Sequence, residues 1–169
     1  MTISRSRGLL RGLAGIAALW PAACAQDPAA QPPGQAEAAL AARFCAAVMA
    51  GDEAAAVGLM TPGLQAQVAR LRAFDRGWRE RNPAEKPPLG DGLRLKAWQD
   101  APRSCDPGPV EGMEVRLTYA PASAPADTWQ DRLVLTRVGE GVAVADIRYE
   151  PGTGGSFAAW LDEALATPG

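Results

Sequence analysis

One change in hydrophobic spacing divides this chain into two halves. Before Pro83, apolar residues recur every three or four positions, which is the spacing of amphipathic helices. After the turn-rich stretch 83–91 they recur at every second position, which is the spacing of half-buried strands. Helices that precede a run of antiparallel strands indicate an α+β fold, in which N-terminal helices pack on a curved antiparallel sheet.

The first half contains signals for three helices. Residues 36–50 are helical by composition, with a buried stripe of Leu40, Phe44, Ala47 and Val48, and Gly51 ends them. Asp52 is a capping residue for a short second helix over 53–60. Thr61 and Pro62 then form a start signal, and the third helix is expected to reach Asn82 before Pro83 stops it.

The second half predicts strands and one last helix. Leu93–Gln99 is expected to be a short strand, followed by a Pro- and Gly-rich loop that contains Cys105. Longer strands are predicted over 112–120, 128–138 and 142–149, with a tight hairpin turn at 139–141. Ser156 is expected to cap a short C-terminal helix that extends through Leu165.

The N-terminus has the pattern of an export signal. Three arginines (Arg5, Arg7 and Arg11) precede a short apolar core over 13–20, and Ala23-Cys24-Ala25 fits a cleavage site. Residues 1–25 are therefore interpreted as a signal peptide, 26–35 as a disordered tether, and 36–166 as a single domain. An alternative is that Cys24 is the acylated cysteine of a lipoprotein, which would anchor the protein to a membrane.

Charge and composition exclude several classes of function. Removing residues 1–25 lowers Lys plus Arg from 17 to 14 and leaves all 19 Asp and Glu, so the mature net charge is −5. This balance argues against nucleic-acid binding. The apolar run at the N-terminus is shorter than the roughly 20 residues of a membrane-spanning helix, and no later stretch is longer, so we expect no transmembrane segment.

The absence of histidine narrows the chemistry further. With no histidine in the chain, Ser-His-Asp and Cys-His catalysis and His-ligated metal sites are excluded. No phosphate-binding glycine motif is present either. We therefore expect neither a metal site nor a cofactor.

Two cysteines remain after cleavage, Cys45 and Cys105. An even number in an oxidising compartment predicts one disulfide, and two free buried thiols are the alternative. Together with the export signal, this pairing favours a periplasmic location.

Asp146 is the strongest candidate for a catalytic residue. It lies in the last predicted strand, where alternation places it on one face with Val142, Val144 and Arg148. A carboxylate among apolar residues can act as a general base, and Tyr119 or Tyr149 could donate a hydrogen bond to an oxyanion. The alternative is that Asp146 pairs with an arginine or a backbone amide and anchors the strand.

Aromatic residues provide a binding hypothesis. Four of them come from separate predicted elements and could line one apolar concavity: Trp78, Trp98, Tyr119 and Trp129. The alternative is that they pack in the core.

Three motifs in order resemble the nuclear transport factor 2-like superfamily. They are Phe44 followed by Gly51-Asp52, the helix start 61–64, and the strand pair 129–137 and 145–149. Within the superfamily, the chain resembles small exported bacterial domains of unknown function. The resemblance implies a cone of bent antiparallel sheet over helices, with a cavity at one end. Val142 departs from the pattern, because relatives often carry tryptophan there.

These observations predict a non-enzymatic periplasmic domain that binds a small apolar ligand or an envelope protein. One alternative is a cofactor-free isomerase or dehydratase that uses Asp146. Another is a structural envelope protein, or lipoprotein, that forms a homodimer through the open face of its sheet.

Overall fold

The computed structural model describes residues 34–87, 89–90, 92–98, 101–122, 127–150 and 154–166. The predicted signal peptide and most of the predicted tether lie outside these residues. The elements follow in the order α1 (Gln35–Ala50), α2 (Glu53–Gly58), α3 (Pro62–Arg81), β1 (Pro102–Glu111), β2 (Glu114–Pro121), β3 (Trp129–Val138), β4 (Gly141–Glu150) and α4 (Phe157–Ala166). The α+β fold class predicted from the sequence is confirmed.

The helix boundaries follow from local capping. Gly51 ends α1 in the left-handed conformation, with φ of 65°. Asp52 Oδ1 then accepts a hydrogen bond from Ala55 N at 2.9 Å and caps α2. Thr61 Oγ1 accepts one from Leu64 N at 3.4 Å, and Pro62 occupies the first turn of α3. The predicted end of the first helix and the predicted starts of the second and third are therefore confirmed.

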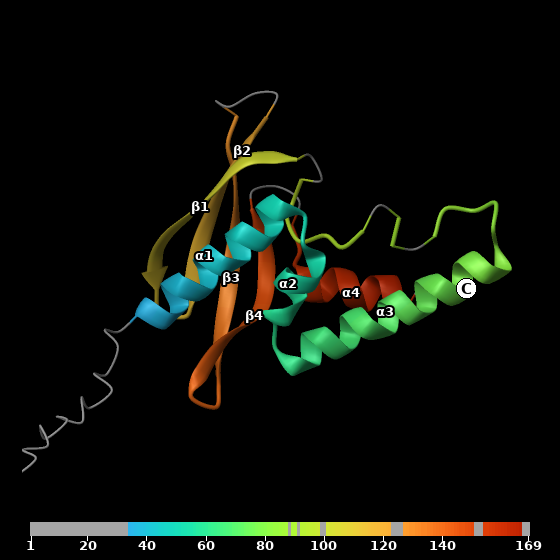
Figure 1. Cartoon of the computed structure of the whole chain (residues 1–169), viewed down its shortest axis with the longest axis horizontal. Helices are drawn as coiled ribbons and strands as arrows, with labels where there is room; N and C mark the ends of the chain where they lie inside the picture. The colour runs from blue at the N-terminus through green and yellow to red at the C-terminus, as the bar shows by residue number, and fades with distance from the viewer. Residues whose placement is uncertain are drawn as a thin grey trace, which may run out of the picture. The chain divides into compact units, whose positions relative to one another are not determined.

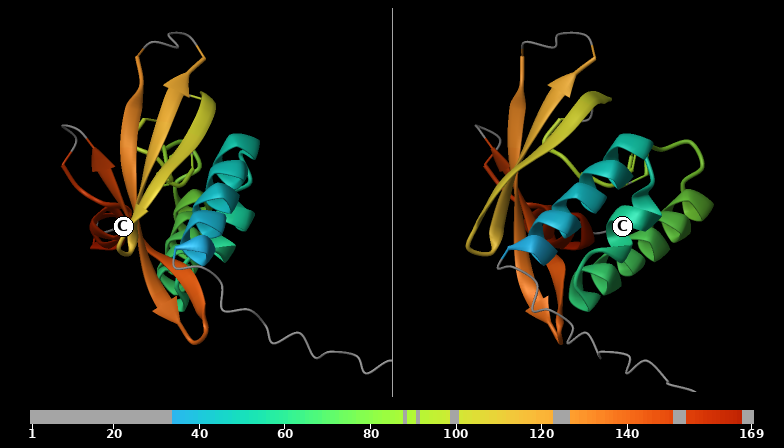
Figure 2. Two further views of the ribbon diagram at one scale, coloured as in Figure 1. Left: turned by 90° about the vertical axis from the view of Figure 1, so that its left-hand side faces the viewer. Right: turned by 60° about the vertical axis from the view of Figure 1, so that its left-hand side comes forward.

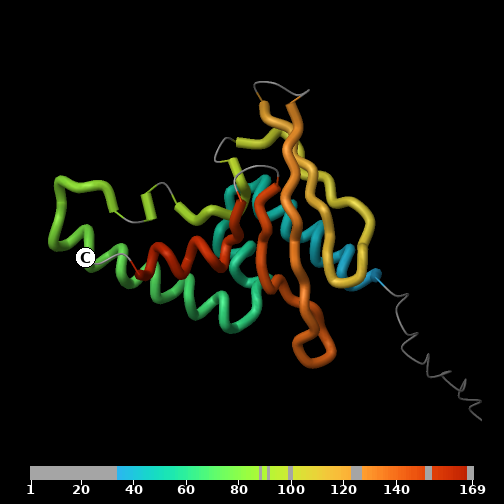
Figure 3. The backbone as a smooth tube through the Cα atoms, turned by 180° about the vertical axis from the view of Figure 1, so that it is seen from behind, coloured from blue at the N-terminus to red at the C-terminus, as the bar shows by residue number. Residues whose placement is uncertain are grey.

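The four strands form one antiparallel sheet in the order β1-β2-β3-β4. Helices α1 to α3 lie on one side of this sheet (Figure 2), and we call the strand surface facing them the inner face. Helix α4 contacts β4 and lies alongside α3 (Figures 1 and 3). The predicted C-terminal helix is thus present, and Ser156 Oγ accepts a hydrogen bond from Ala159 N at its start.

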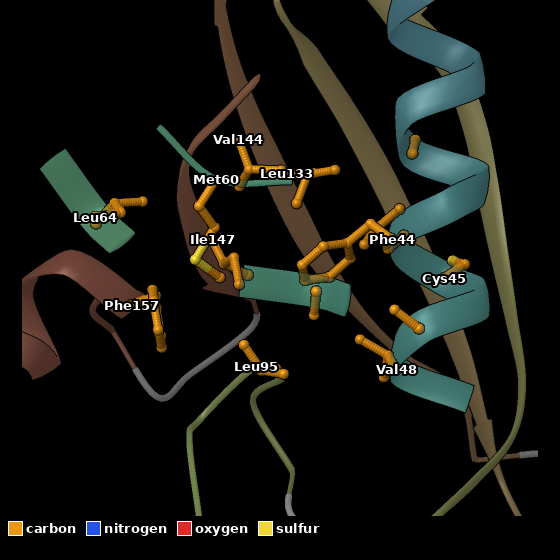
Figure 4. Packing of buried hydrophobic residues seen from close by; sticks show 14 of the residues in the cluster. Phe44, Cys45, Val48, Met60, Leu64, Leu95, Leu133, Val144, Ile147 and Phe157 are labelled. Atoms are coloured by element: carbon orange, nitrogen blue, oxygen red, sulfur yellow. The ribbon is translucent and has the colours of Figure 1, made fainter. Parts of the chain in front are cut away.

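The core fills the space between the inner face and the helices. Inner-face residues of three strands are fully buried, among them Val115, Leu133 and Ile147. They meet side chains from every helix and two residues outside the helices and strands, Met60 and Leu95 (Figure 4). Burying each such side chain stabilises the fold by about 1.5–3 kcal/mol. The face of α1 predicted from spacing is therefore the one that is buried against the sheet.

The prediction that Cys105 lies in a loop is wrong, because residues 102–111 form strand β1. This segment contains Pro102, Pro107 and Pro109. Proline has no backbone N–H to donate to a neighbouring strand, so the sequence argued against a strand here. Strand β1 is at the edge of the sheet and pairs only with β2. Edge strands tolerate proline because one side needs no partner.

The short strand predicted over Leu93–Gln99 is also wrong for its described part, residues 93–98, which join no strand. We call residues 92–98 the strap. Its backbone N–H groups at Leu93 and Ala97 donate to the side chains of Glu53 and Asp131 rather than to a neighbouring strand. The strap therefore crosses the inner face, with Leu95 buried in the core.

The outer face of the sheet is charged. Arg132 of β3 forms ion pairs with Glu114 at 3.0 Å and with Glu150 at 3.2 Å, and Arg148 pairs with Glu114 at 2.9 Å. These residues come from β2, β3 and β4 and cover the middle of the sheet. Within the described part of the chain, no helix is long and apolar enough to span a membrane.

Candidate functional site

A disulfide joins the helical layer to the sheet next to the candidate site. Cys45 of α1 is bonded to Cys105 of β1, with 5.4 Å between their Cα atoms. The predicted disulfide is therefore confirmed. Cys105 is paired in register with Tyr119 of β2, which in turn is paired with Trp129 of β3. The disulfide thus fixes α1 over one end of the inner face.

Four residues at this end form what we call the polar cluster: Tyr119, Trp129, Asp131 and Tyr149. The rings of Tyr119 and Trp129 stack with centroids 5.3 Å apart and an interplanar angle of 17°. Asp131 is the next inward residue after Trp129 on β3, and it is paired in register with Tyr149 of β4. Three adjacent strands thus place aromatic and acidic side chains on neighbouring inner-face positions.

Three polar atoms of the cluster are buried without a hydrogen-bond partner. They are the Tyr119 hydroxyl oxygen, Trp129 Nε1 and Asp131 Oδ1. Tyr119 and Asp131 have no exposed surface, and Trp129 is 7% exposed. Leaving such an atom unpaired costs about 1–3 kcal/mol, so buried polar groups almost always have a partner. These three atoms lie at neighbouring positions on one end of the inner face.

Burial sets the protonation of the cluster. Desolvation raises the pKa of Asp131 to about 6, despite the opposing hydrogen bond from Ala97 N. Burial, reinforced by the nearby Asp131 charge, raises the pKa values of Tyr119 and Tyr149 far above their usual range. Both phenols are therefore neutral hydrogen-bond donors at physiological pH, whereas Asp131 changes charge close to it.

The strap covers the polar cluster and is held there by side chains. Ala97 N donates to Asp131 Oδ2 at 3.0 Å, and the Tyr149 hydroxyl donates to the carbonyl oxygen of Arg94 at 2.5 Å. Leu93 N donates to Glu53 Oε1 at 3.0 Å. The strap is thus attached to α2, β3 and β4 through individual hydrogen bonds rather than through a strand ladder.

An open pocket lies on each side of the strap. One, of about 210 Å³, is bounded by the α1–α2 turn and by strap residues that include Leu93 and Lys96. The other, of about 300 Å³, is bounded by Arg94 and Ala97 of the strap, by Tyr149, and by the start of α4. Because Ala97 and Tyr149 also contact or pair with Asp131, the second pocket shares a wall with the polar cluster.

The four aromatic residues predicted to bind a ligand divide into two groups. Tyr119 and Trp129 are brought together in the polar cluster. Trp78 lies on α3, where its ring is 6.3 Å from that of Phe74. Trp98 ends the strap and is 53% exposed. The structure therefore assembles only half of the predicted set at the candidate site.

Asp146 lies on the opposite face of the sheet from Tyr119. A β-bulge shifts the register between the Leu135–Val144 and Val134–Asp146 pairs, so the inward alternation is interrupted after Val144. Asp146 Oδ1 accepts hydrogen bonds from Ile147 N at 2.8 Å and from Ala158 N at 2.9 Å. Its carboxylate thus holds the first turn of α4 against β4, and it shares no face with Val144.

Asp131 is the residue that sequence reasoning did not single out. Alternation in β3 places Trp129, Asp131, Leu133 and Leu135 on one face, and all four are buried. The sequence could have identified Asp131, because it is an acidic residue at an inward position of a strand whose other inward residues are apolar. Its importance depends on Tyr119 and Tyr149, which only the strand pairing brings next to it.

Within the described ranges, no group of three or more acidic or cysteine side chains is placed to hold a metal ion. Comparisons of the chain with models of protein families, with curated proteins and with solved structures found no match.

Proposed function

We propose that this protein is an exported periplasmic domain of the nuclear transport factor 2-like type that binds a small ligand at the polar cluster without transforming it. The observation that carries the proposal is the set of three unpaired buried polar atoms on Tyr119, Trp129 and Asp131. Buried polar groups in a core almost always have a partner, so several unpaired atoms at adjacent positions favour a bound ligand.

The chemistry of the cluster defines the ligand. The Tyr119 hydroxyl and Trp129 Nε1 are hydrogen-bond donors, and Asp131 Oδ1 is an acceptor when ionised. The surroundings are aromatic and aliphatic, with Leu117 and Leu133 as inner-face neighbours of Asp131. We infer a small, mainly apolar molecule that carries one hydroxyl or carbonyl group, and this polar end is bound between the three atoms.

The ligand reaches the cluster by displacement of the strap. The described hydrogen bonds that join the strap to α2, β3 and β4 are individual contacts with side chains, each contributing about 1 kcal/mol. Breaking the hydrogen bond from Ala97 N to Asp131 and moving Ala97 aside would be enough to connect the polar cluster to the pocket lined by Tyr149. This arrangement accounts for a buried site that a ligand can still enter.

The location rests on the export pattern and on the disulfide. A Cys45–Cys105 bond is compatible with an extracytoplasmic protein, because such compartments are oxidising. Cleavage after Ala25 would release the domain, and acylation of Cys24 would anchor it. The mass of the protein isolated from the envelope distinguishes the two forms.

Native mass spectrometry of protein isolated from the cell envelope tests ligand binding. We expect one small molecule per chain, which is lost in Tyr119→Phe and Asp131→Asn but retained in Asp106→Asn, a matched change on the exposed side of β1. A chain mass without any bound molecule, together with crystallographic density for water alone between Tyr119, Trp129 and Asp131, would overturn the proposal.

A second candidate function is cofactor-free proton transfer with Asp131, rather than Asp146, as the base. The raised pKa of Asp131, about 6, favours it, because a base with a pKa near the working pH is effective. Tyr119 would donate a hydrogen bond to the oxygen that gains charge. Deuterium incorporation beside the carbonyl of added ketones, followed by NMR in D₂O, should then require Asp131; incorporation that is unchanged in Asp131→Asn would eliminate this candidate.

Dimerisation through the open sheet face receives less support. A dimer formed in this way needs an exposed apolar surface on the sheet. The described outer face instead carries ion pairs among Glu114, Arg132, Arg148 and Glu150. A light-scattering mass that is twice the monomer mass and does not change with salt would support dimerisation.

A further inference from the structure

The pocket between the strap and α4 has the features of a separate binding site. We call it the rim pocket, with a volume of about 300 Å³. Its described walls come from the strap, the end of β4, the residues just before α4, and α4 itself. The residues that carry side chains suited to binding are Arg94, Tyr149, Ser156 and Trp160.

Arg94 is the distinctive residue of the rim pocket. It is exposed, and its guanidinium lies over the Trp160 ring, 5.7 Å from the ring centroid. Among the described residues no carboxylate forms an ion pair with it. The arginine is thus positioned by an aromatic ring while its hydrogen-bond donors stay available, an arrangement that suits a carboxylate.

The other side chains complete a site that is both polar and aromatic. The Ser156 hydroxyl oxygen accepts from Ala159 N at 3.3 Å, so its hydrogen can be donated to a ligand. Tyr149 and Trp160 both contribute aromatic surface to the lining. Glu163, which is acidic and also belongs to the described lining, already takes part in an interaction of its own.

We propose that the rim pocket binds a small aromatic carboxylate. The carboxylate pairs with the Arg94 guanidinium and accepts a hydrogen bond from the Ser156 hydroxyl, and the ring packs against Tyr149 and Trp160. A cavity of about 150 Å³ holds a benzene ring. The rim pocket therefore has room for such a ring together with its carboxylate and bound water.

The rim pocket meets the polar cluster at Tyr149, which belongs to both. Its lining includes none of Tyr119, Trp129 and Asp131, whose unpaired atoms carry the proposed function. The two sites share only the wall formed by Ala97 and Tyr149. Variants of Arg94 and of Asp131 therefore test them independently.

Titration of the purified domain with benzoate, followed by calorimetry and by tryptophan fluorescence, tests the proposal. We expect saturable binding, and benzamide, the neutral analogue, should bind at least about tenfold more weakly, because a charge-assisted pair is lost. Arg94→Gln should weaken benzoate binding by a similar factor without changing the melting temperature, since Arg94 is exposed. Trp160→Leu should weaken it as well.

Matched controls separate this site from general effects. Arg70→Gln changes an exposed arginine on α3, and Trp98→Leu changes the exposed tryptophan of the strap; both should leave benzoate binding unchanged. Asp131→Asn should also bind benzoate normally even if it loses the ligand of the polar cluster. Equal affinity in wild type and Arg94→Gln, or no benzoate binding up to about 10 mM, would overturn the proposal.

Discussion

Asp131 accepts the backbone N–H of Ala97 at 3.0 Å, and through this bond an internal strand of the sheet holds the strap. The same carboxyl has its other oxygen buried and unpaired beside Tyr119 and Trp129. The Asp131 side chain therefore both holds the strap and forms part of the polar cluster. The strength of the hydrogen bond that holds the strap therefore depends on the protonation of Asp131.

Asp131 is expected to make the domain more stable in mild acid. Its pKa is about 6 in the folded state against an ordinary value of 3.8, so between these values the folded chain binds the proton that the unfolded chain releases. The free energy of unfolding should accordingly fall by about 1 kcal/mol as the pH rises from 5 to 7. Urea denaturation at the two pH values measures the change.

The matched variant Asp131→Asn removes this titration. Its free energy of unfolding should vary less between pH 5 and pH 7, and at pH 7 it should equal or exceed that of the wild type. A wild-type protein that becomes more stable as the pH rises over this range, with the slope abolished by Asp131→Asn, would contradict the assignment of a raised pKa.

Gly92→Ala should loosen the strap. Gly92 has φ of +123°, and an added Cβ would lie 2.5 Å from Glu53 Oε1, the acceptor for Leu93 N. Backbone strain and the displaced carboxylate should together cost about 1–3 kcal/mol locally. Hydrogen exchange at Leu93 and Ala97 should accelerate.

Gly112→Ala is the control for this change. Gly112 also has a positive φ, of +65°, but no atom lies within 4 Å of the added Cβ. It should strain the β1–β2 turn without altering exchange in the strap. Identical exchange profiles in the two variants would show that the close approach of Gly92 to Glu53 does not matter.

Removing the disulfide should destabilise the domain strongly. The bond joins residues 60 positions apart, for which the chain-entropy treatment gives about 4 kcal/mol. Cys45→Ala with Cys105→Ala should therefore lower the urea midpoint in the absence of reductant. Wild-type protein should respond to reductant in the same direction, and the double variant should not respond.

Asp146→Ala should reduce stability and leave ligand binding at the polar cluster intact. The change removes the acceptor for Ala158 N at the start of α4, a loss of about 1 kcal/mol for a capping interaction. Asp146→Asn keeps one oxygen acceptor and should be milder. Loss of the ligand of the polar cluster in Asp146→Asn, at unchanged stability, would instead return Asp146 to a functional role.

Local signals predicted the helices and the longer strands well. The helix starts at Asp52 and at Thr61-Pro62 depend only on contacts between residues close in the chain, so the sequence alone was enough to predict them. Alternation in β2 and β3 worked for the same reason, because one face of each strand is buried. Strand β1 failed because the tolerance of its prolines depends on its position at the sheet edge.

The candidate site was only partly readable. Tyr119 and Trp129 were named from the sequence, but their stacking requires the pairing of β2 with β3. Asp146 was misplaced because one inserted residue in β4 changes which face a side chain occupies, and an isolated strand pattern does not reveal a bulge. Asp131 gains its raised pKa from burial by segments distant in the chain.

The sequence by itself determined the order of helices and strands, the caps that end them, the pair of cysteines and the absence of histidine chemistry. These depend on spacing, composition and contacts within a few residues. Only the tertiary structure decided that 92–98 is a strap rather than a strand, and that Asp131 is buried beneath it with unpaired neighbours. Burial and hydrogen-bond partners are set by residues such as Glu53 and Tyr149, which approach the strap only when the chain is folded.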